Sequence, residues 1–220
     1  MTVNKENRGP GNLYGHPLSY YLDLYRSSVP QELSEQVNLS YFAPIQSFRF
    51  RFLGTLYEVT HPDFTIRHLE EGMGVYPLEE QSTAQILLLR YLLEGNFNHP
   101  AGTFLSYRDL PWGETYFRQF QGRCILRLAK QYGQRAETFC RTMENLHAVP
   151  LSFGNHAYQI EIFDQLSVCL ILWEGDEEYP ASAQILFSDN FASAFSAEDA
   201  AYACDIVLNY LRDCETETDS

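Results

Sequence analysis

The feature that most constrains the fold is a pair of apolar runs in the last third of the chain. Ala157 to Phe163 and Leu166 to Trp173 are rich in branched and aromatic residues, and only Asp164 and Gln165 separate them. Two runs of this length with a two-residue link are typical of an antiparallel hairpin. A third run, Ser182 to Phe187, follows after a polar segment. The sequence therefore predicts a C-terminal antiparallel meander.

The polar segment between the second and third runs, Trp173 to Ser182, is called the acidic turn below. Its sequence is Trp-Glu-Gly-Asp-Glu-Glu-Tyr-Pro-Ala-Ser, with carboxylates at Glu174, Asp176, Glu177 and Glu178 and no base among them. The spacing does not match a calcium loop of the helix-loop-helix type, which needs acids at alternate positions. Crowded carboxylates stay in water, accept hydrogen bonds from nearby amides, or bind a metal or cationic ligand. All three alternatives remain open.

Upstream of the meander the sequence predicts both strands and helices. Phenylalanine alternates with arginine at the start of residues 48–59, which predicts a strand, and residues 61–63 predict a turn into a second strand at 64–69. Helical spacing predicts helices within residues 17–37, 78–94, 114–132 and 134–147, and a last helix capped by Ser196 and Asp199. The predicted class is α+β, an antiparallel sheet made of an N-terminal hairpin and the C-terminal meander, with helices packed mainly on one face.

The chain of 220 residues is long enough for one continuous core and shows no internal repeat or low-complexity linker. We expect a loose N-terminal leader at residues 1–15, a single α+β domain at 16–214 and a polar C-terminal tail at 215–220.

Charge and composition exclude some classes of partner. The 15 basic and 29 acidic residues give a formal net charge of −14, so neither nucleic acid nor an anionic membrane is an expected partner. The five cysteines are odd in number and widely spaced, which fits no disulfide framework or zinc pattern. The polar start lacks the apolar core of a signal peptide, and the longest apolar run, residues 86–93, is too short to span a bilayer. We expect a cytoplasmic protein.

No catalytic pattern is complete in this sequence. It lacks a phosphate loop, a nucleophile elbow, a His-Glu-x-x-His motif and a dinucleotide glycine pattern. The helix at 134–147 has Cys140, Glu144 and His147 on one side, although a border cysteine is typical of core filling. A Cys-His nucleophile pair would need His147 or His156 beside a partly exposed thiol, a contact that sequence cannot show. Catalytic residues and cofactors stay unassigned.

Several blocks occur together in a recognisable order. The acidic turn continues into Ile185-Leu-Phe187 and a helix with Glu198-Asp199, and upstream lie Ile86 to Leu92, Pro100-Ala-Gly102, Tyr107 to Pro111 and Leu128 to Gly133. Over roughly Phe48 to Leu211 these blocks resemble an uncharacterised prokaryotic family, the domain of unknown function 3786.

The resemblance implies a stand-alone cytoplasmic domain of anaerobic bacteria and archaea. Some members of this family have an extra cysteine-rich iron-sulphur segment and occur in a corrinoid or one-carbon setting, but this chain has no cysteine cluster for such a group. Tyr179 stands where the family motif commonly has Phe. The family brings no known activity, so no catalytic residue is carried over.

Three hypotheses for function follow. The first is a cytoplasmic, non-catalytic binding or accessory module that recognises a small molecule or a protein partner near the acidic turn. Its candidate binding residues are Trp173, Asp176, Glu177, Glu178, Tyr179 and Arg108. The second is a metal-assisted enzyme that uses Asp176 and Glu178 as ligands, or as acid and base. The third is a structural or oligomerisation protein, and the sequence does not set its oligomeric state.

Overall fold

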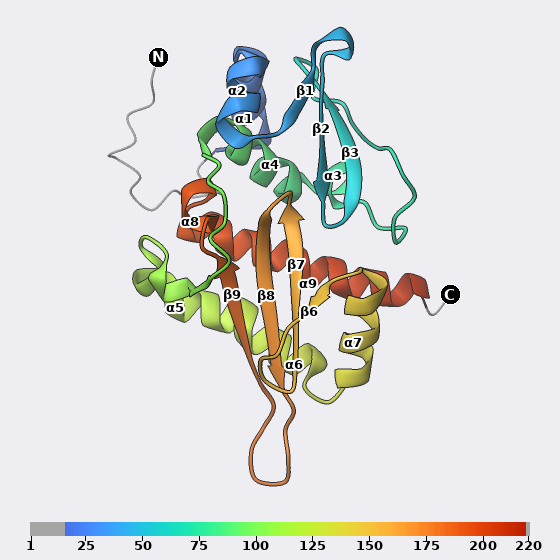
Figure 1. Cartoon of the computed structure of the whole chain (residues 1–220), viewed down its shortest axis with the longest axis vertical. Helices are drawn as coiled ribbons and strands as arrows, with labels where there is room; N and C mark the ends of the chain where they lie inside the picture. The colour runs from blue at the N-terminus through green and yellow to red at the C-terminus, as the bar shows by residue number, and fades with distance from the viewer. Residues whose placement is uncertain (1–15, 219–220) are drawn as a thin grey trace.

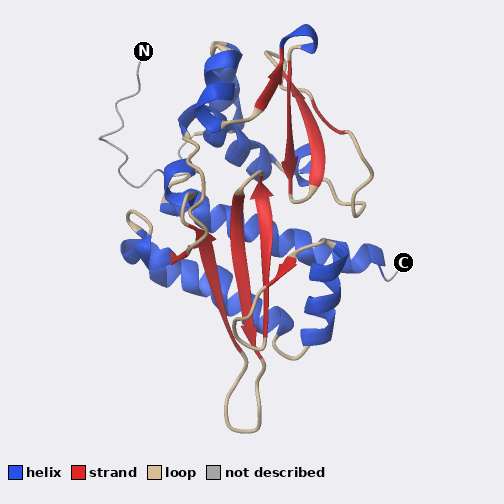
Figure 2. Ribbon diagram, viewed as in Figure 1, coloured by secondary structure: helices blue, strands red, loops and turns tan. Residues whose placement is uncertain are grey.

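A computed structural model describes residues 16–218 of the chain. The expected leader, residues 1–15, lies outside the described residues, as do residues 219 and 220. Within the described range the strands form one antiparallel sheet, and helices lie behind and beside it (Figures 1 and 2).

Helices and strands alternate irregularly along the chain. The helices are α1 Leu18–Arg26, α2 Pro30–Val37, α3 Pro77–Glu80, α4 Ser82–Glu94, α5 Gly113–Phe120, α6 Leu126–Tyr132, α7 Ala136–Asn145, α8 Phe191–Ala194 and α9 Ala197–Thr218. Short 3-10 helices span Ala43–Ile45 and Tyr107–Asp109. A π-helical segment, Gln121–Ile125, joins α5 to α6. The strands are β1 Ser40–Phe42, β2 Ser47–Phe52, β3 Thr55–Thr60, β4 Ile66–His68, β5 Phe104–Ser106, β6 Val149–Pro150, β7 His156–Phe163, β8 Leu166–Trp173 and β9 Ser182–Ser188.

The predicted C-terminal meander is present as β7, β8 and β9. The strand order is β4-β3-β2-β7-β8-β9-β5, with β1 paired to β2 and β6 paired to β7. Alternate residues of the buried strand β8 face opposite sides of the sheet. Val168, Leu170 and Leu172 belong to the main core, whereas Cys169 and Ile171 belong to a small cluster on the other side. The predicted α+β class with an antiparallel sheet is confirmed.

The predicted N-terminal hairpin contains one more turn than the sequence indicated. Residues 48–59 were expected as one strand, but the chain reverses at Leu53 and Gly54, so that β2 and β3 pair through Phe52 and Thr55. Both turn residues have positive φ, +48° and +84°, as a two-residue hairpin turn requires. Leucine rarely adopts this conformation. Its buried side chain and a hydrogen bond from its N–H to the Ile162 carbonyl (3.1 Å) hold it there.

The N-terminal strands join the meander at a narrow place in the sheet. Only one residue pair, Phe52 with Phe163, connects β2 to β7, and β7 has a register shift between Glu161 and Phe163. The Phe163 ring packs on Phe50, Phe52, Tyr91 and Phe195, so aromatic contacts reinforce this joint. Figure 1 shows β1–β3 on one side of the joint and β7–β9 on the other.

A buried ion pair ties three helices together. Arg90 of α4 lies within hydrogen-bond distance of Asp199 of α9 (Nε to Oδ1, 2.7 Å) and donates to the Tyr21 hydroxyl of α1 (3.1 Å). Burial, the largest single cause, lowers the pKa of Arg90, but Asp199, Glu94 and Tyr21 together outweigh it and hold the pKa above its usual range. Asp199 also accepts from Ser196, which confirms the predicted cap of the last helix.

The last helix is longer than expected. It continues to Thr218 and so includes part of residues 215–220, which the sequence suggested as a tail. Glu215 in this extension pairs with Arg135 at 2.6 Å. Within residues 16–218, no helix is both long and apolar enough to cross a lipid bilayer.

Candidate functional site

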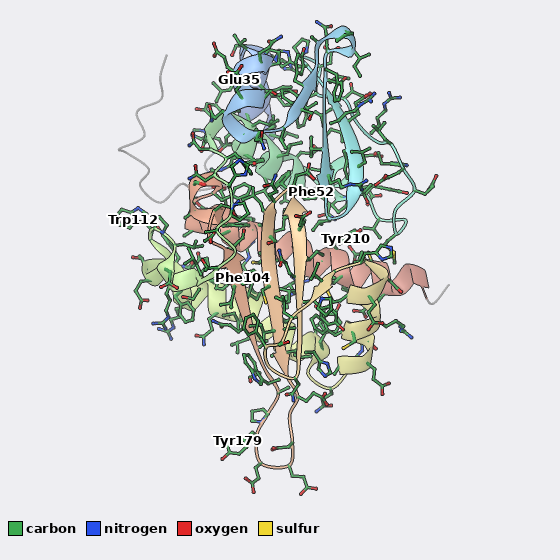
Figure 3. All side chains as sticks on the ribbon, in the orientation of Figure 1. Glu35, Phe52, Phe104, Trp112, Tyr179 and Tyr210 are labelled. Carbon is green, nitrogen blue, oxygen red and sulfur yellow. The ribbon has the colours of Figure 1, made fainter. Side chains whose placement is uncertain are left out.

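The acidic turn projects away from the body of the protein. It connects β8 to β9, and Figure 3 shows Tyr179 on the protruding loop. Trp173 is 38% exposed and Tyr179 is 68% exposed. Trp173 therefore lies at the base of the loop and does not belong to the interior of the sheet.

Backbone amides order the acidic turn. One oxygen of Asp176 accepts hydrogen bonds from the N–H groups of Glu178 (2.8 Å) and Tyr179 (2.7 Å). These two amides, with that of Tyr179 as the larger cause, hold the pKa of Asp176 below its usual range. The Asp176 N–H donates to the Tyr179 carbonyl at 2.9 Å, which closes the loop. The charges of Glu177 and Glu178 lie on its exposed surface.

The described contacts of Arg108 are with residues outside the acidic turn. Its guanidinium pairs with Glu114 at 3.2 Å and lies 3.9 Å from the Phe117 ring centroid, both in α5. No group of three or more His, Cys, Asp or Glu side chains among residues 16–218 is arranged to hold a metal ion. A metal site at Asp176 and Glu178 stays a prediction.

A cavity of about 560 Å³ lies beside the joint of the sheet, and none of its lining residues belongs to the acidic turn. This volume is in the range of small-molecule pockets in proteins. Its walls come from the tip of the β2–β3 hairpin, residues 70–73, the link between α7 and β6 at residues 145–149, β7 and α9. Tyr210, labelled in Figure 3, supplies the contribution of α9.

The floor of the cavity is fixed by buried groups. Leu53, Ile160 and Tyr210 line it and are almost fully buried. The Tyr210 hydroxyl donates to the Leu53 carbonyl (3.4 Å), so α9 holds the hairpin tip in place. The register shift in β7 begins directly after the lining residue Glu161. Such shifts are common next to binding sites, because they redirect side chains.

The end of α7 forms the opposite wall. His147 has a φ of +53°, its N–H donates to the Glu144 carbonyl, and the Ala148 N–H donates to the Met143 carbonyl. These two bonds make a Schellman motif, whose left-handed position usually has glycine. A histidine here costs about 1 kcal/mol or more of backbone strain. Leu53 and His147, both with positive φ, thus face the same cavity.

The rim of the cavity has an excess of negative charge. Arg51 forms an ion pair with Glu70 and donates to the Gly54 carbonyl at 2.6 Å. Hydrogen bonding from Arg51 lowers the pKa of Glu70, because it stabilises the carboxylate. Two further carboxylates, Glu71 and Glu161, also line the rim. Since one arginine faces three glutamates, the cavity attracts cations and repels anions.

Sequence reasoning missed this cavity because its residues come from five separate segments. The acidic turn, in contrast, has four carboxylates within five consecutive positions, which a sequence shows directly. One signal in the sequence was Leu53-Gly54 between two apolar stretches, since a glycine there marks a turn. A second was Glu70-Glu71-Gly72, two acids directly before a glycine-rich link.

A family-wide sequence profile described as "Domain of unknown function (DUF3786)" matches residues 29–210. The matched range contains the acidic turn and every residue that lines the cavity. No curated protein and no solved structure matches the chain.

Proposed function

The chain belongs to the family of domains of unknown function 3786, and on that premise we propose that it is a binding module whose cavity takes a small organic cation. One observation carries the proposal: the cavity of about 560 Å³ has an apolar floor and a rim with more carboxylates than bases. An apolar body of the ligand would lie on Leu53 and Ile160. Its cationic group would lie near Glu71 and Glu161.

The charge of the whole chain supports the same class of ligand. A formal net charge of −14 produces a negative field that raises the local concentration of cations. Glu71 accepts a hydrogen bond from the Tyr76 hydroxyl (3.3 Å), and Glu161 accepts one from the backbone N–H of Gln165 (3.3 Å). Both contacts leave carboxylate lone pairs for a ligand.

A series of isosteric probes tests the charge preference. Benzylamine, benzyl alcohol and benzoate have the same ring and differ in charge. We expect benzylamine to raise the melting temperature most, benzyl alcohol less, and benzoate not at all. At a hundred times Kd, binding stabilises a protein by about 2.7 kcal/mol, or roughly 5–10 °C for a domain of this size. Equal shifts with benzylamine and benzoate would contradict the proposal.

Matched variants test the location. Val149 lines the cavity and is 55% exposed, so Val149→Trp obstructs the cavity with little cost to the core. Val29→Trp, at a position 49% exposed outside the cavity lining, is its control. Glu161→Gln removes one rim charge, and Glu177→Gln removes one charge from the acidic turn. We expect only the two cavity variants, Val149→Trp and Glu161→Gln, to reduce the rise in melting temperature with benzylamine. If only Glu177→Gln reduced this rise, the ligand would bind at the acidic turn.

We further propose that the protein works in the cytoplasm of an anaerobic prokaryote. All five cysteines are free thiols, which is the usual state in a reducing compartment. The anaerobic setting rests on the family resemblance. Fractionation of native cells checks the compartment, and recovery of the protein outside the cytoplasm would contradict it.

A further inference from the structure

Three side chains outside the cavity form a linear hydrogen-bonded chain. The Cys140 sulfur of α7 lies 3.2 Å from Nδ1 of His156, at the start of β7. Nε2 of the same imidazole lies 2.6 Å from Oε1 of Glu174, directly after β8. This is the Cys-His contact that sequence could not show. A nucleophile, a base and a group that orients the base share this arrangement in many enzymes that form covalent intermediates.

The partners of His156 define which nitrogen holds the proton. A carboxylate only accepts hydrogen bonds, so Nε2 donates to Glu174 in the neutral imidazole. Nδ1 then has a free lone pair directed at the thiol. The imidazole is therefore arranged to remove the Cys140 proton, and Glu174 stabilises the imidazolium that results. Because the thiol and the carboxylate lie on opposite nitrogens, the three groups form a nucleophile, a base and an orienting carboxylate, and they cannot chelate one ion.

The surroundings of the thiol provide access and a hydrogen-bond donor. Cys140 is partly exposed, whereas the other four cysteines are buried, and the His156 and Glu174 side chains are 26% and 53% exposed. The Tyr158 hydroxyl lies near Cys140. Burial and then Cys140 raise the pKa of Tyr158 to about 12, so this phenol stays protonated at neutral pH. A protonated phenol beside the sulfur can donate to an oxygen of a substrate.

We propose that Cys140 is a catalytic nucleophile that accepts an acyl group from a small uncharged or cationic ester or thioester, with His156 as its base and Glu174 as a positioning residue. The cluster lies outside the cavity lining, so this activity is independent of the proposed binding of an organic cation. Glu144 of α7 and Glu174 flank the cluster and disfavour an anionic substrate.

The proposed reaction balances without an oxidant or a cofactor. The Cys140 sulfur forms a bond to the carbonyl carbon while its proton passes to Nδ1 of His156. The carbonyl oxygen becomes an oxyanion, to which Tyr158 donates. The oxyanion collapses, the bond to the leaving group breaks, and that group takes the proton from His156. Water then repeats the sequence on the thioester with His156 as base, which releases the acid and the free thiol.

The test uses the full chain and 4-nitrophenyl acetate, an uncharged ester, with nitrophenolate release and peptide mass spectrometry as readouts. We expect acetylation at Cys140 and not at the four buried cysteines, which are internal controls. His156→Gln should slow acetylation about 100-fold or more, the usual contribution of a general base. Cys140→Ser should lose the acetyl group at this position, while circular dichroism checks that each variant is folded.

Glu174→Gln separates positioning from a purely structural role. Glu174 is exposed, so the variant should fold, yet the imidazolium loses its carboxylate. The titratable groups around the thiol are His156, Tyr158, Glu144 and Glu174. We expect the rate of Cys140 acetylation to rise with pH in both proteins, with the limb of the Glu174→Gln profile displaced to lower pH, because the imidazolium has lost the carboxylate that stabilises it. An unchanged profile would overturn the role of Glu174. No acetyl group on Cys140 together with no nitrophenolate release that depends on Cys140, or the same rate in folded His156→Gln, would overturn the proposal.

Discussion

Glu58 is a buried acid in the N-terminal strands whose charge is satisfied from both sides. Its two oxygens accept hydrogen bonds from Arg49 (2.7 Å) and Arg67 (2.6 Å), while the side chain is only 5% exposed. Burial alone raises its pKa, but the two guanidinium groups outweigh burial and hold the pKa below the usual value. A depressed pKa means that ionised Glu58 stabilises the fold above its unfolded pKa. This contribution is lost as pH falls through the folded value.

We predict that Glu58→Gln lowers the free energy of unfolding at pH 7 by about 1–3 kcal/mol, the usual worth of hydrogen bonds to a charged group. The difference from the parent protein should shrink as pH falls below about 4, the usual pKa of an unfolded glutamate, and then through the lower pKa of folded Glu58. Urea denaturation at several pH values measures it. The exposed Glu35→Gln is the control, with an expected change within about 0.5 kcal/mol. A constant difference across pH would contradict the assigned role.

Contacts between single residues could be predicted from the sequence where the two residues are close together in the chain. Ser196 and Asp199 are three residues apart, so their cap follows from spacing alone. Cys140, His156 and Glu174 come from a helix and two strand ends. Their contact depends on how α7 packs on the sheet, and no spacing rule contains that information.

The β2–β3 hairpin is the element on which the cavity most depends. Gly54 has a φ of +84°, and a Cβ added there would meet nothing within 4 Å. Any effect of Gly54→Ala is therefore due to the backbone. Gly122 lies in the π-helical segment between α5 and α6. A Cβ added there would also meet nothing within 4 Å, but Gly122 has no left-handed φ. The two glycines form a matched pair.

We predict opposite effects for the two alanine variants. Gly54→Ala should lower the free energy of unfolding by about 1–2 kcal/mol, because alanine is strained at positive φ. Gly122→Ala should raise it by about 0.5–1 kcal/mol, because alanine loses less backbone entropy in a helix. Chemical denaturation of both variants measures this. If both variants changed the free energy of unfolding in the same direction, the positive φ of Gly54 would not limit stability.

Element boundaries were predictable where hydrophobic periodicity was uninterrupted, as in β7 and β8. The helix expected at residues 78–94 is instead divided at Gln81, whose extended backbone separates α3 from α4. The hairpin was missed because Leu-Gly is not a usual pair for a turn with two left-handed residues, where Asn-Gly is typical. Burial of Leu53 in the core overrides its local preference. That burial depends on β7 and α9, which are distant in the sequence.

For the whole molecule, the class of fold follows from the order of the elements, since consecutive strands with a two-residue link indicate antiparallel pairing, and an antiparallel sheet with helices packed beside it is an α+β arrangement. The position of the cavity does not follow in this way. Its walls meet because a single residue pair joins two groups of strands beside α7 and α9. The acidic turn, although the most distinctive stretch of sequence, extends from the far end of β8 and β9 (Figure 1).

The most direct test of the central claim is a crystal structure of the protein soaked separately with benzylamine and with benzoate. We predict that benzylamine occupies the cavity, with its ring over Leu53 and Ile160 and its ammonium group beside Glu71 or Glu161. Benzoate should be absent from the cavity at the same concentration. Benzylamine bound at the carboxylates of the acidic turn, with the cavity empty, would contradict the account.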